Sequence, residues 1–321
     1  MPRSTLIYNP AAGRFPAAPF VTRAASVLER YGWTIQLLES WDYEQLREQA
    51  QSAVDRQDDA VFVAGGDGSV GKVASVLIDT DTALGVLPSG TANVWAKEIG
   101  LQHLDWLHRT ALEDAAARLA RGSYRLIDLG ICNNEVFILW AGVGLDGEIV
   151  ENVEPRNRLE KSLAVPYYAA LALWNSLGWQ GVDLTFNSEG ESLSGTFTVV
   201  MSSNIRAYAG GYIQLTPNAK IDDGKLDFWL FEGNSFADVI HHVALMFRGK
   251  HIDAEGVYHF QVEEATIEAG RPLPMQFDGE PTTMEAPVKF HVLNQRLRVI
   301  VPEGSAQGLF SSGNPTEQAL G

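Results

Sequence analysis

The stretch AVFVAGGDGSVGKVASVL, residues 60–77, joins an apolar run, a glycine cluster and a helix-like pattern. Strand, glycine turn and helix in this order form one unit of an alternating α/β domain. Three nucleotide motifs fit the turn. Gly66, Gly68 and Gly71 match the dinucleotide fingerprint G-x-G-x-x-G, and Gly66 to Lys72 supply most of a phosphate loop G-x-x-x-x-G-K. The third reading is G-G-D-G-S.

Strand and helix patterns alternate on both sides of this stretch. Strands are expected at 4–8, 33–40, 60–66 and 83–90, and helices at about 19–31, 42–57 and 69–78. This alternation predicts a parallel sheet with helices on its faces. Residues 1–122 are therefore expected to form an α/β domain, with a boundary at Gly122 and Ser123.

From residue 124 the pattern changes to strands joined by short turns. The turns CNNE, NSEGES and LNQR each predict an antiparallel hairpin. Helical segments interrupt the strands near 160–178 and 236–248. Residues 123–302 are thus expected to form a mainly antiparallel β domain, and the polar residues 303–321 a disordered tail.

The composition is that of a globular protein with room for two domains: of 321 residues, 45% are hydrophobic and 20% charged. The net charge of −16 argues against a nucleic-acid partner, because phosphates are neutralised by clustered Lys and Arg. The single cysteine, Cys132, fits a reducing cytosol. The longest apolar stretch, 163–174, is too short to cross a bilayer. A cytoplasmic location is expected, with peripheral association at the inner membrane face left open.

Three of the four predicted strands end in turns suited to phosphate: NPAAG, GGDGS and PSGTAN. Ligands of an open parallel sheet bind beyond the carboxyl ends of its strands. Glycine lets backbone N–H groups approach an anion, and helices that begin after Gly68 and Gly90 would add positive dipole ends. A single turn of this kind is usually structural, but three at one edge predict a nucleotide site.

Asp67 decides between the three motifs. The dinucleotide reading needs an acidic residue after the next strand, where Pro88 and Ser89 stand, and the phosphate loop needs Ser or Thr where Val73 stands. Both readings put the Asp67 carboxylate against the nucleotide phosphates, which it would repel without a divalent ion between them. The sequence therefore predicts phosphoryl transfer that depends on Mg²⁺.

At whole-chain level the sequence resembles the diacylglycerol kinase catalytic domain family, in particular its small bacterial lipid kinases. The resemblance rests on motifs in a fixed order: IYNPAAG, AGGDGSVGKVASVL, LGVLPSGTANVWAKEIG, IDLGICN, WAGVGLDGEIV, AYAGGYIQLTPNAKIDDGKLDFWLF and MQFDGEP. It implies a kinase that uses ATP and Mg²⁺, with an α/β nucleotide domain and a β-sandwich that helps to receive the lipid.

The resemblance also implies roles for individual residues. The positions that match the ATP site of the family are Asn9, Ser40, Gly65, Gly66, Asp67, Gly68, Ser69 and Thr91. Asp67 and Asp128 match the residues that organise the catalytic Mg²⁺. A structural Mg²⁺ site is implied at Lys220, Asp223 and Lys225. Plainer interpretations remain, since Ser69 and Ser89 also suit helix N-caps and Asp-Asp-Gly suits a turn.

Asp278, in QFDGEP, matches the general base of the family, which takes the proton of the attacking lipid hydroxyl. Its alternative interpretation is an ordinary Asp-Gly hairpin turn. The chain departs from common family members at Val94, where many carry aspartate, and at Gly71, where many carry asparagine. These departures would weaken Mg²⁺ binding and the hydrogen bonds to phosphate.

Other candidates are interpreted as structural. His241 and His242 are adjacent and face different ways on a helix, and Cys132 lacks an activating base nearby, so it is expected to be buried. An aromatic group is expected in the core, or alternatively at a lipid surface with two cations. The aromatic residues are Tyr167, Tyr168, Trp174 and Trp179, and the cations Arg158 and Lys161.

The function expected from the sequence is transfer of the ATP γ-phosphoryl group to a lipid hydroxyl, with diacylglycerol as the default acceptor. The expected partners are ATP and a lipid at a membrane surface. Two alternatives stay open. One is an NAD kinase-like phosphotransferase, although the N-E motif of that family is absent after GTAN. The other is a nucleotide-binding regulatory protein without turnover.

Overall fold

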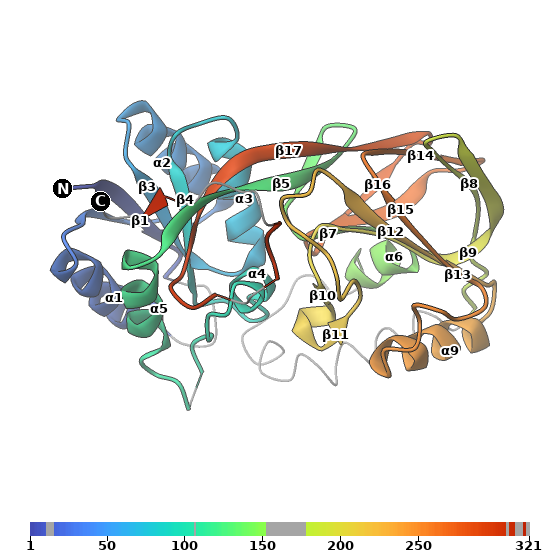
Figure 1. Cartoon of the computed structure of the whole chain (residues 1–321), viewed down its shortest axis with the longest axis horizontal. Coiled ribbons are helices and arrows are strands. Elements are labelled where there is room, and N and C mark those ends of the chain that lie inside the picture. Colours follow the sequence, from blue (N-terminus) through green and yellow to red (C-terminus); the bar gives the residue numbers. More distant parts are fainter. Residues whose placement is uncertain (11–15, 106, 152–177, 306–307, 312–316, 319–321) are drawn as a thin grey trace. The chain divides into compact units, whose positions relative to one another are not determined.

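The computed structural model describes residues 1–10, 16–105, 107–151, 178–305, 308–311 and 317–318, without the side chains of 150, 151, 317 and 318. The chain forms two compact units (Figure 1). Unit 1 comprises Met1–Asp128 together with Gln295–Gly321, and unit 2 comprises Leu129–Asn294. Two strands, β5 (Ser123–Cys132) and β17 (Val288–Val301), continue from one unit into the other.

Unit 1 contains a parallel sheet with the strand order β2-β1-β3-β4. Its strands are β1 (Arg3–Tyr8), β2 (Thr34–Glu39), β3 (Ala60–Gly65) and β4 (Ala83–Pro88), and β17 joins β4 in parallel at Val299. The helices are α1 (Ala18–Arg30), α2 (Tyr43–Asp55), α3 (Asp67–Leu77), α4 (Val94–Glu98) and α5 (Ala111–Ala120). Figure 1 shows α1 with α5 on one side of the sheet and α2 with α3 on the other. The predicted α/β architecture is confirmed.

The two central strands carry the core of unit 1. Every residue of β3 and β4 is buried, as expected for continuous apolar runs covered on both faces. Phe62 of β3 packs edge to face on Trp33. Its ring also fills the space beside Gly85, where an added Cβ would lie 2.4 Å from the ring. Gly85 therefore belongs to strand packing and not to the nucleotide turns.

Helix starts in unit 1 follow local capping chemistry. α1 has proline in its first turn, and α2 begins after Asp42, whose side chain accepts the N–H of Gln45 at 2.8 Å. α3 begins at Asp67, after Gly66 as N-cap. The sequence prediction that this helix begins after Gly68 was wrong, because an acidic residue is favourable in the first turn of a helix.

Unit 2 is built from antiparallel strands. They follow the order β16-β15-β7-β9-β8-β14-β17, and β12 connects β9 with β13. The main strands are β7 (Trp140–Gly144), β8 (Val182–Ser188), β9 (Glu191–Ser203), β12 (Leu226–Glu232), β13 (Val257–Val262), β14 (Glu264–Ala269), β15 (Leu273–Phe277) and β16 (Glu280–Met284). The shorter strands are β6 (Glu135–Phe137), β10 (Ala207–Tyr208) and β11 (Ile213–Gln214). This is the predicted antiparallel sandwich.

In the described part of unit 2, these strands are accompanied by the helices α6 (Leu145–Glu151) and α9 (Phe236–Phe247) and by the 3-10 turn η1 (Ala209–Gly211). The core between the strands is rich in phenylalanine. Phe186, Phe228 and Phe290 are almost completely buried, and Phe228 contacts both of the other rings. Aromatic pairs of this kind add to the apolar area that is buried. The helix predicted near 236–248 is confirmed.

Two of the three predicted hairpins are present. CNNE joins β5 to β6 and NSEGES joins β8 to β9. LNQR was predicted to be a third hairpin, and this is wrong, because residues 293–296 lie inside the continuous strand β17. Gln295 there is left-handed (φ 51°), so the motif makes a local irregularity in a strand.

The described residues near the end of the chain differ from the disordered tail that the sequence predicted for 303–321. Leu309 is fully buried, and β18 (Glu317–Gln318) pairs antiparallel with β5. Unit 1 also includes Gln295–Val301, which the boundaries at 122 and 302 would place in the second domain. The helix predicted near 160–178 lies, except for Gly178, outside the described residues.

Candidate functional site

Four turns share the carboxyl edge of the unit 1 sheet. The strand registers align Tyr8 with Glu39 and Ala64, and Gly65 with Pro88. Since parallel strands end together, the residues that follow them lie along one edge. The nucleotide candidates lie at the end of β3, on these turns or in the helical turn that follows: Asn9, Ser40, Gly65, Gly66, Asp67, Gly68, Ser69 and Thr91.

The turns after β3 and β4 touch through their backbones. The carbonyl of Gly65 accepts the N–H groups of Ser89 (3.3 Å) and Gly90 (3.2 Å). A Cβ added at Gly90 would lie 2.3 Å from the Cα of Gly66. Position 90 therefore requires glycine, because the two backbones approach too closely for a side chain. The turns after β3 and β4 pack directly on each other.

Asn93 holds the second of these turns. Its side-chain amide accepts the N–H of Gly90 and donates to the carbonyl of Gly90, each at 2.9 Å. Its own backbone is left-handed (φ 50°) and its side chain is buried. The sequence reasoning did not single out Asn93. The signal was available, because asparagine tolerates this conformation and bonds to nearby backbone groups.

Asp67 connects the two helices that follow the turns. It is the first residue of α3, and its Oδ1 accepts the backbone N–H of Trp95 in α4 at 3.1 Å. Burial raises the pKa of Asp67, while the N–H groups of Val94 and Trp95 and the charge of Lys97 oppose the rise. The Asp67 carboxylate thus has a structural partner as well as a place beside the nucleotide turns.

The two serines of the turns are not helix caps. The N-cap of α3 is Gly66 and that of α4 is Asn93, so the capping alternative for Ser69 and Ser89 is wrong. Ser69 instead lies in the first turn of α3 and packs on Gly65, whose ideal Cβ would meet the Ser69 Cβ at 2.8 Å. The side chain of Ser69 therefore limits the residue at 65 to glycine.

The remaining nucleotide candidates follow β1, β2 and β4. Ser40 is buried, its Oγ donates to the carbonyl of Asp42 at 2.9 Å, and its N–H donates to the carbonyl of Tyr8 at 2.8 Å. Asn9 and Thr91 are partly buried polar residues at this same edge. The edge therefore offers hydroxyl, amide and backbone N–H groups, which bind phosphate without adding negative charge.

Asp128 lies on β5 and is fully buried. Its Oδ1 accepts the N–H of Gln295 at 2.7 Å. Because Gln295 is the left-handed residue of β17, this bond satisfies a backbone donor that the irregular strand exposes. Asp128 thereby joins the two strands that run between the units, a role that its sequence context did not reveal.

Asp278 occupies the turn between β15 and β16 and is held by backbone donors. Its Oδ2 accepts the N–H of Ile138 (2.8 Å), and its Oδ1 accepts those of Leu139 (2.8 Å) and Trp140 (3.1 Å). Both Asp278 (φ 50°) and Gly279 (φ 91°) are left-handed, so the Asp-Gly hairpin turn expected as the plainer interpretation is present. Three N–H donors stabilise the ionised carboxylate and fix its direction.

A buried polar network supports this turn, and the sequence reasoning missed it. The Gln276 side chain donates to Asp146 and accepts the N–H of Gly279 at 2.8 Å. Tyr208 donates its hydroxyl to the other oxygen of Asp146. Burial raises the pKa of Asp146 and, together with the adjacent Asp146 charge, that of Tyr208. The sequence did contain a sign of this network, because Asp146 lies inside the apolar run WAGVGLDGEIV, where a charged residue needs buried partners.

A second acidic group surrounds the turn before β12. Asp223 accepts the N–H of Lys225 (3.1 Å) and the side-chain amide of Gln261 (3.2 Å). Burial, and then the charges of Asp227 and Asp222, raise the pKa of Asp223. A cation held by the Asp223 carboxylate and the carbonyls of Lys220 and Lys225 would relieve this repulsion. Among the described residues, however, no group of three or more His, Cys, Asp and Glu side chains is arranged to hold a metal.

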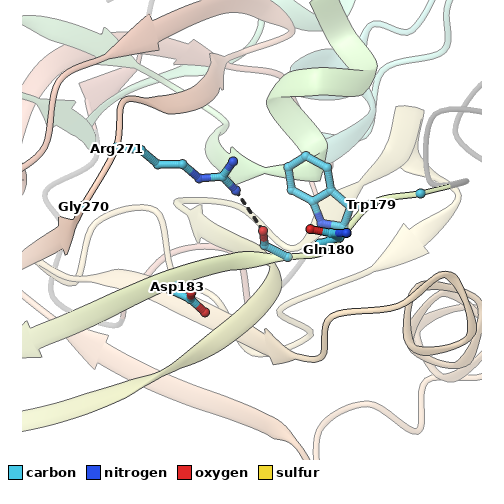
Figure 2. A pocket seen from close by; sticks show the side chains of 7 residues that line it. Trp179, Gln180, Asp183, Gly270 and Arg271 are labelled. Atoms are coloured by element: carbon cyan, nitrogen blue, oxygen red, sulfur yellow. Dashed lines mark hydrogen bonds between the residues drawn. The ribbon is translucent and has the colours of Figure 1, made fainter.

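Unit 2 also has an open pocket beside β8, shown in Figure 2. Arg271 donates to the carbonyl of Gly181 at 2.9 Å, and Asp183 puts a carboxylate on the same lining. Trp179 donates its indole N–H to the carbonyl of Thr198 at 3.1 Å and packs on the core. The prediction of core packing is confirmed for Trp179. The other members of that aromatic group and its two cations lie outside the described residues.

Two further candidates are structural, as predicted. Cys132 is completely buried, and burial raises the pKa of its thiol to about 12, so the thiolate is not formed near neutral pH. His242 bonds through Nε2 to the carbonyl of Glu232 at 2.7 Å, while His241 is exposed. The two histidines therefore differ in burial, although their ring centres lie 5.6 Å apart.

Family models cover most of the chain. The model of the diacylglycerol kinase catalytic domain matches residues 3–132. The model described as the YegS C-terminal NAD kinase beta sandwich-like domain matches residues 140–301. The chain belongs to the diacylglycerol kinase family. Its two matches correspond to the parallel α/β region and the antiparallel region described above.

Relatives in this family extend over nearly the same length. The chain is 26% identical to the diacylglycerol kinase of Bacillus subtilis, over 96% of this chain and 99% of that protein. It is 28% identical to a diacylglycerol kinase of Mycobacterium tuberculosis, over 88% and 93%. A putative diacylglycerol kinase from Bacillus anthracis has the same fold, with a TM-score of 0.76 over 95% of this chain and 98% of that one, at 20% identity.

Val94 and Gly71 are the two positions at which the sequence predicted a departure from the diacylglycerol kinase family pattern. Val94 is the first residue of α4 and is almost completely buried. Gly71 lies inside α3, one residue before Lys72, whose ammonium lies 5.9 Å from the centre of the Tyr43 ring. Val94 thus adds an apolar side chain to the core at the start of α4. No helix in the described part of the chain is long and apolar enough to cross a membrane.

Proposed function

We propose that this chain is a Mg²⁺-dependent kinase that transfers the γ-phosphoryl group of ATP to the hydroxyl of a lipid, with diacylglycerol as the default acceptor. The observation that carries the proposal is the backbone contact of the turns after β3 and β4, in a chain whose family is named for this reaction. Such a reaction also requires a cytoplasmic protein that reaches the inner face of a membrane.

Each nucleotide residue has a task in this proposal. Backbone N–H groups at Gly66 and in the first turn of α3 would bind the phosphates, because the first N–H groups of a helix have no partner inside it. Hydroxyl and amide groups add neutral contacts. The residues assigned to ATP remain Asn9, Ser40, Gly65, Gly66, Asp67, Gly68, Ser69 and Thr91.

The donor set at the nucleotide turns is compatible with Mg²⁺. This ion keeps several waters and needs only one or two protein carboxylates. Asp67, whose pKa burial raises, gains from a cation nearby, so Asp67 and Asp128 would hold the ion, partly through water. When bound, Mg²⁺ would neutralise charge on the phosphates. The second site, at Lys220, Asp223 and Lys225, would stabilise the shape of unit 2.

Asp278 is the proposed general base. As the lipid hydroxyl oxygen bonds to the γ-phosphorus, the bond from phosphorus to the ADP oxygen breaks, and the hydroxyl proton passes to the Asp278 carboxylate. A carboxylate accepts about four hydrogen bonds. The three backbone donors fix the direction of the Asp278 carboxylate, which is what a base that receives the substrate proton requires.

A nucleotide-binding protein without turnover is the second candidate. The observation in its favour is the buried Val94, which removes one carboxylate from the expected metal network. An NAD kinase-like activity is supported by the G-G-D-G turn and by the sandwich fold of unit 2. The two alternatives and the lipid kinase each predict a different product pattern in one phosphate-transfer assay.

The deciding experiment follows radiolabelled phosphate from [γ-³²P]ATP, with Mg²⁺, into a total bacterial lipid extract, and into NAD in a parallel reaction. We expect one labelled lipid. The variant Asp278→Asn should lower kcat by a factor of about 10² to 10⁴ and leave ATP binding nearly unchanged. Thermal unfolding of the variant reports whether its backbone contacts survive.

The matched control is Asp253→Asn, which neutralises an exposed aspartate of the same unit. It should keep full activity. Labelled NAD without labelled lipid would replace the proposal by the NAD kinase-like alternative. Tight ATP binding with neither product would support the regulatory protein, and equal activity of Asp278→Asn and wild type would remove Asp278 as the base.

A further inference from the structure

The helix α9 has two apolar faces. Val239, His242 and Met246 point inward and are buried. Ile240, Val243 and Phe247 follow the same helical spacing one position later, and their exposed fractions are 37%, 36% and 62%. A surface helix normally carries polar residues on its outer face. An outer apolar face of this kind marks an interaction site.

The outer face is held in a fixed direction. Ser235 and Asp238 form a capping box at the start of α9, with the Ser235 Oγ accepting the N–H of Asp238 and the Asp238 carboxylate accepting the N–H of Ser235 at 3.0 Å. Inside, His242 bonds to the carbonyl of Glu232. Because the start and the inner face of α9 are both bound, Phe247 remains outward as part of the folded unit.

Charge distinguishes this surface from the rest of the protein. The chain has 40 Asp and Glu residues and a net charge of −16, yet residues 239–252 contain none of either. Arg248 and Lys250 lie one and three positions after Phe247, and both are exposed. Neither makes an ion pair with any residue in the described ranges. The surface therefore has an apolar face with two cations at the end of α9, and the exposed acidic residues Asp253 and Glu255 follow only after residue 252.

We propose that this surface of α9, formed by Ile240, Val243 and Phe247 with Arg248 and Lys250, docks on a lipid bilayer that contains anionic lipids. A helix that lies on a membrane buries apolar side chains among the acyl chains, while cations at its border meet anionic headgroups. The choice of a bilayer follows from the charge complementarity. It also rests on the proposed function, since a lipid acceptor has to be reached at a membrane.

Binding to vesicles tests this surface directly. The full chain is sedimented with vesicles of phosphatidylcholine mixed with phosphatidylglycerol, and with vesicles of phosphatidylcholine alone. We expect binding to the mixed vesicles, weakened by salt. The double variant Ile240→Asp/Phe247→Asp should bind at least about tenfold more weakly. The double variant Arg248→Glu/Lys250→Glu should lose binding by about fivefold for each cation, on the anionic vesicles only.

Matched controls separate the surface from general effects. Leu107→Asp changes a residue of unit 1 that is 88% exposed, and Arg30→Glu/Arg47→Glu reverses two exposed cations of the same unit. Both should bind vesicles like wild type. All variants should unfold at the temperature of wild type within a few degrees, because the changed side chains are at the surface.

Three outcomes would overturn the proposal. Wild type could fail to sediment with anionic vesicles, or the α9 variants could bind like the controls. Alternatively, size-exclusion chromatography could show a dimer that Ile240→Asp/Phe247→Asp dissociates, with no vesicle binding, which would assign the surface to a second copy of the chain. Phosphoryl transfer to lipid in detergent micelles tests the proposed function separately. The α9 variants should keep that activity, and a wild type inactive in micelles would contradict the kinase and not the docking surface.

Discussion

Three small residues determine the structure of the nucleotide edge. Gly66 and Gly90 permit two backbones to meet, and Asn93 satisfies both backbone groups of Gly90. The glycines were predicted from motif and strand position. The contact between them was not, because it joins positions 24 residues apart along the chain and depends on how two strands lie side by side.

A methyl group at position 90 should break this contact. In Gly90→Ala the new Cβ would lie 2.3 Å from the Cα of Gly66, and neither backbone can move without disturbing a strand end. We expect a loss of about 1–3 kcal/mol in the free energy of unfolding and much weaker ATP binding. Urea unfolding and ATP titration measure the two effects.

Gly270→Ala is the control, since an added Cβ there meets nothing within 4 Å. Its unfolding free energy should stay within about 0.5 kcal/mol of wild type. If Gly90→Ala does not fold, Asn93→Ala provides a milder test, because it removes two hydrogen bonds to the backbone of Gly90 and leaves the Gly90 N–H bonded to the Gly65 carbonyl alone. ATP binding at wild-type strength in both variants would contradict a nucleotide site at these turns.

At the scale of elements, α9 was predicted and its exposed apolar face was not. Helical spacing identifies apolar positions, and in α9 these positions surround most of the helix. Which of them are covered depends on the strands against which α9 packs. The same holds for His242, whose buried environment follows from its contact with Glu232 at the end of β12.

His242 should make the stability of unit 2 depend on pH. Burial lowers its pKa, with a smaller lowering by His241, while the Glu232 carbonyl and the charges of Asp238 and Glu232 oppose it. The unfolded histidine therefore takes up a proton at a higher pH than the folded one. Stability should fall as the pH drops below the unfolded value of about 6.5.

The measurement is urea unfolding at about pH 7 and about pH 5.5, on either side of the ordinary histidine pKa. His242→Gln should reduce the loss of stability on acidification relative to wild type. His241→Gln changes the exposed neighbour and should retain most of that loss. Identical pH dependence in His242→Gln and wild type would show that His242 does not titrate in this way.

At the scale of the whole molecule, unit 1 contains both ends of the chain. Four residues of β17, Leu297, Val299, Ile300 and Val301, are buried in it. Asp128 and Gln295, where the chain leaves and re-enters this unit, are joined by a hydrogen bond of 2.7 Å. A short linker between Asp128 and Gln295 can therefore connect the two chain segments of unit 1 in the absence of unit 2.

A chain of residues 1–128 joined to 295–321 by a linker of about four Gly and Ser residues should fold. It should bind ATP within about tenfold of the full chain, because every residue assigned to ATP belongs to unit 1. Circular dichroism and ATP titration test this. Residues 1–128 alone should not fold, since burying each of these four side chains of β17 contributes about 1.5–3 kcal/mol, and the buried Leu309 would be missing as well. ATP binding by the full chain but not by a folded linked unit would place part of the site in unit 2.

Much of the architecture was predictable because its causes are local. Alternating strand and helix patterns identified the parallel sheet, and short polar turns identified two hairpins. The hairpin prediction at LNQR was wrong because a turn and an irregularity within a strand favour the same residue types. For Asp278, the hairpin turn could be predicted from the Asp-Gly pair. Its three backbone donors could not, because they come from residues 138–140, far away in the sequence.

The sequence alone determined the two kinds of sheet, the glycine turns at one sheet edge and the family of the protein, because periodicity, turn chemistry and ordered motifs are all written along the chain. Only the tertiary structure decided that Gly66 meets Gly90, that Asp128 holds the irregular residue of β17 and that α9 turns an apolar face outward. Each of these depends on which distant segments pack together. Burial and close backbone contact are properties of that packing.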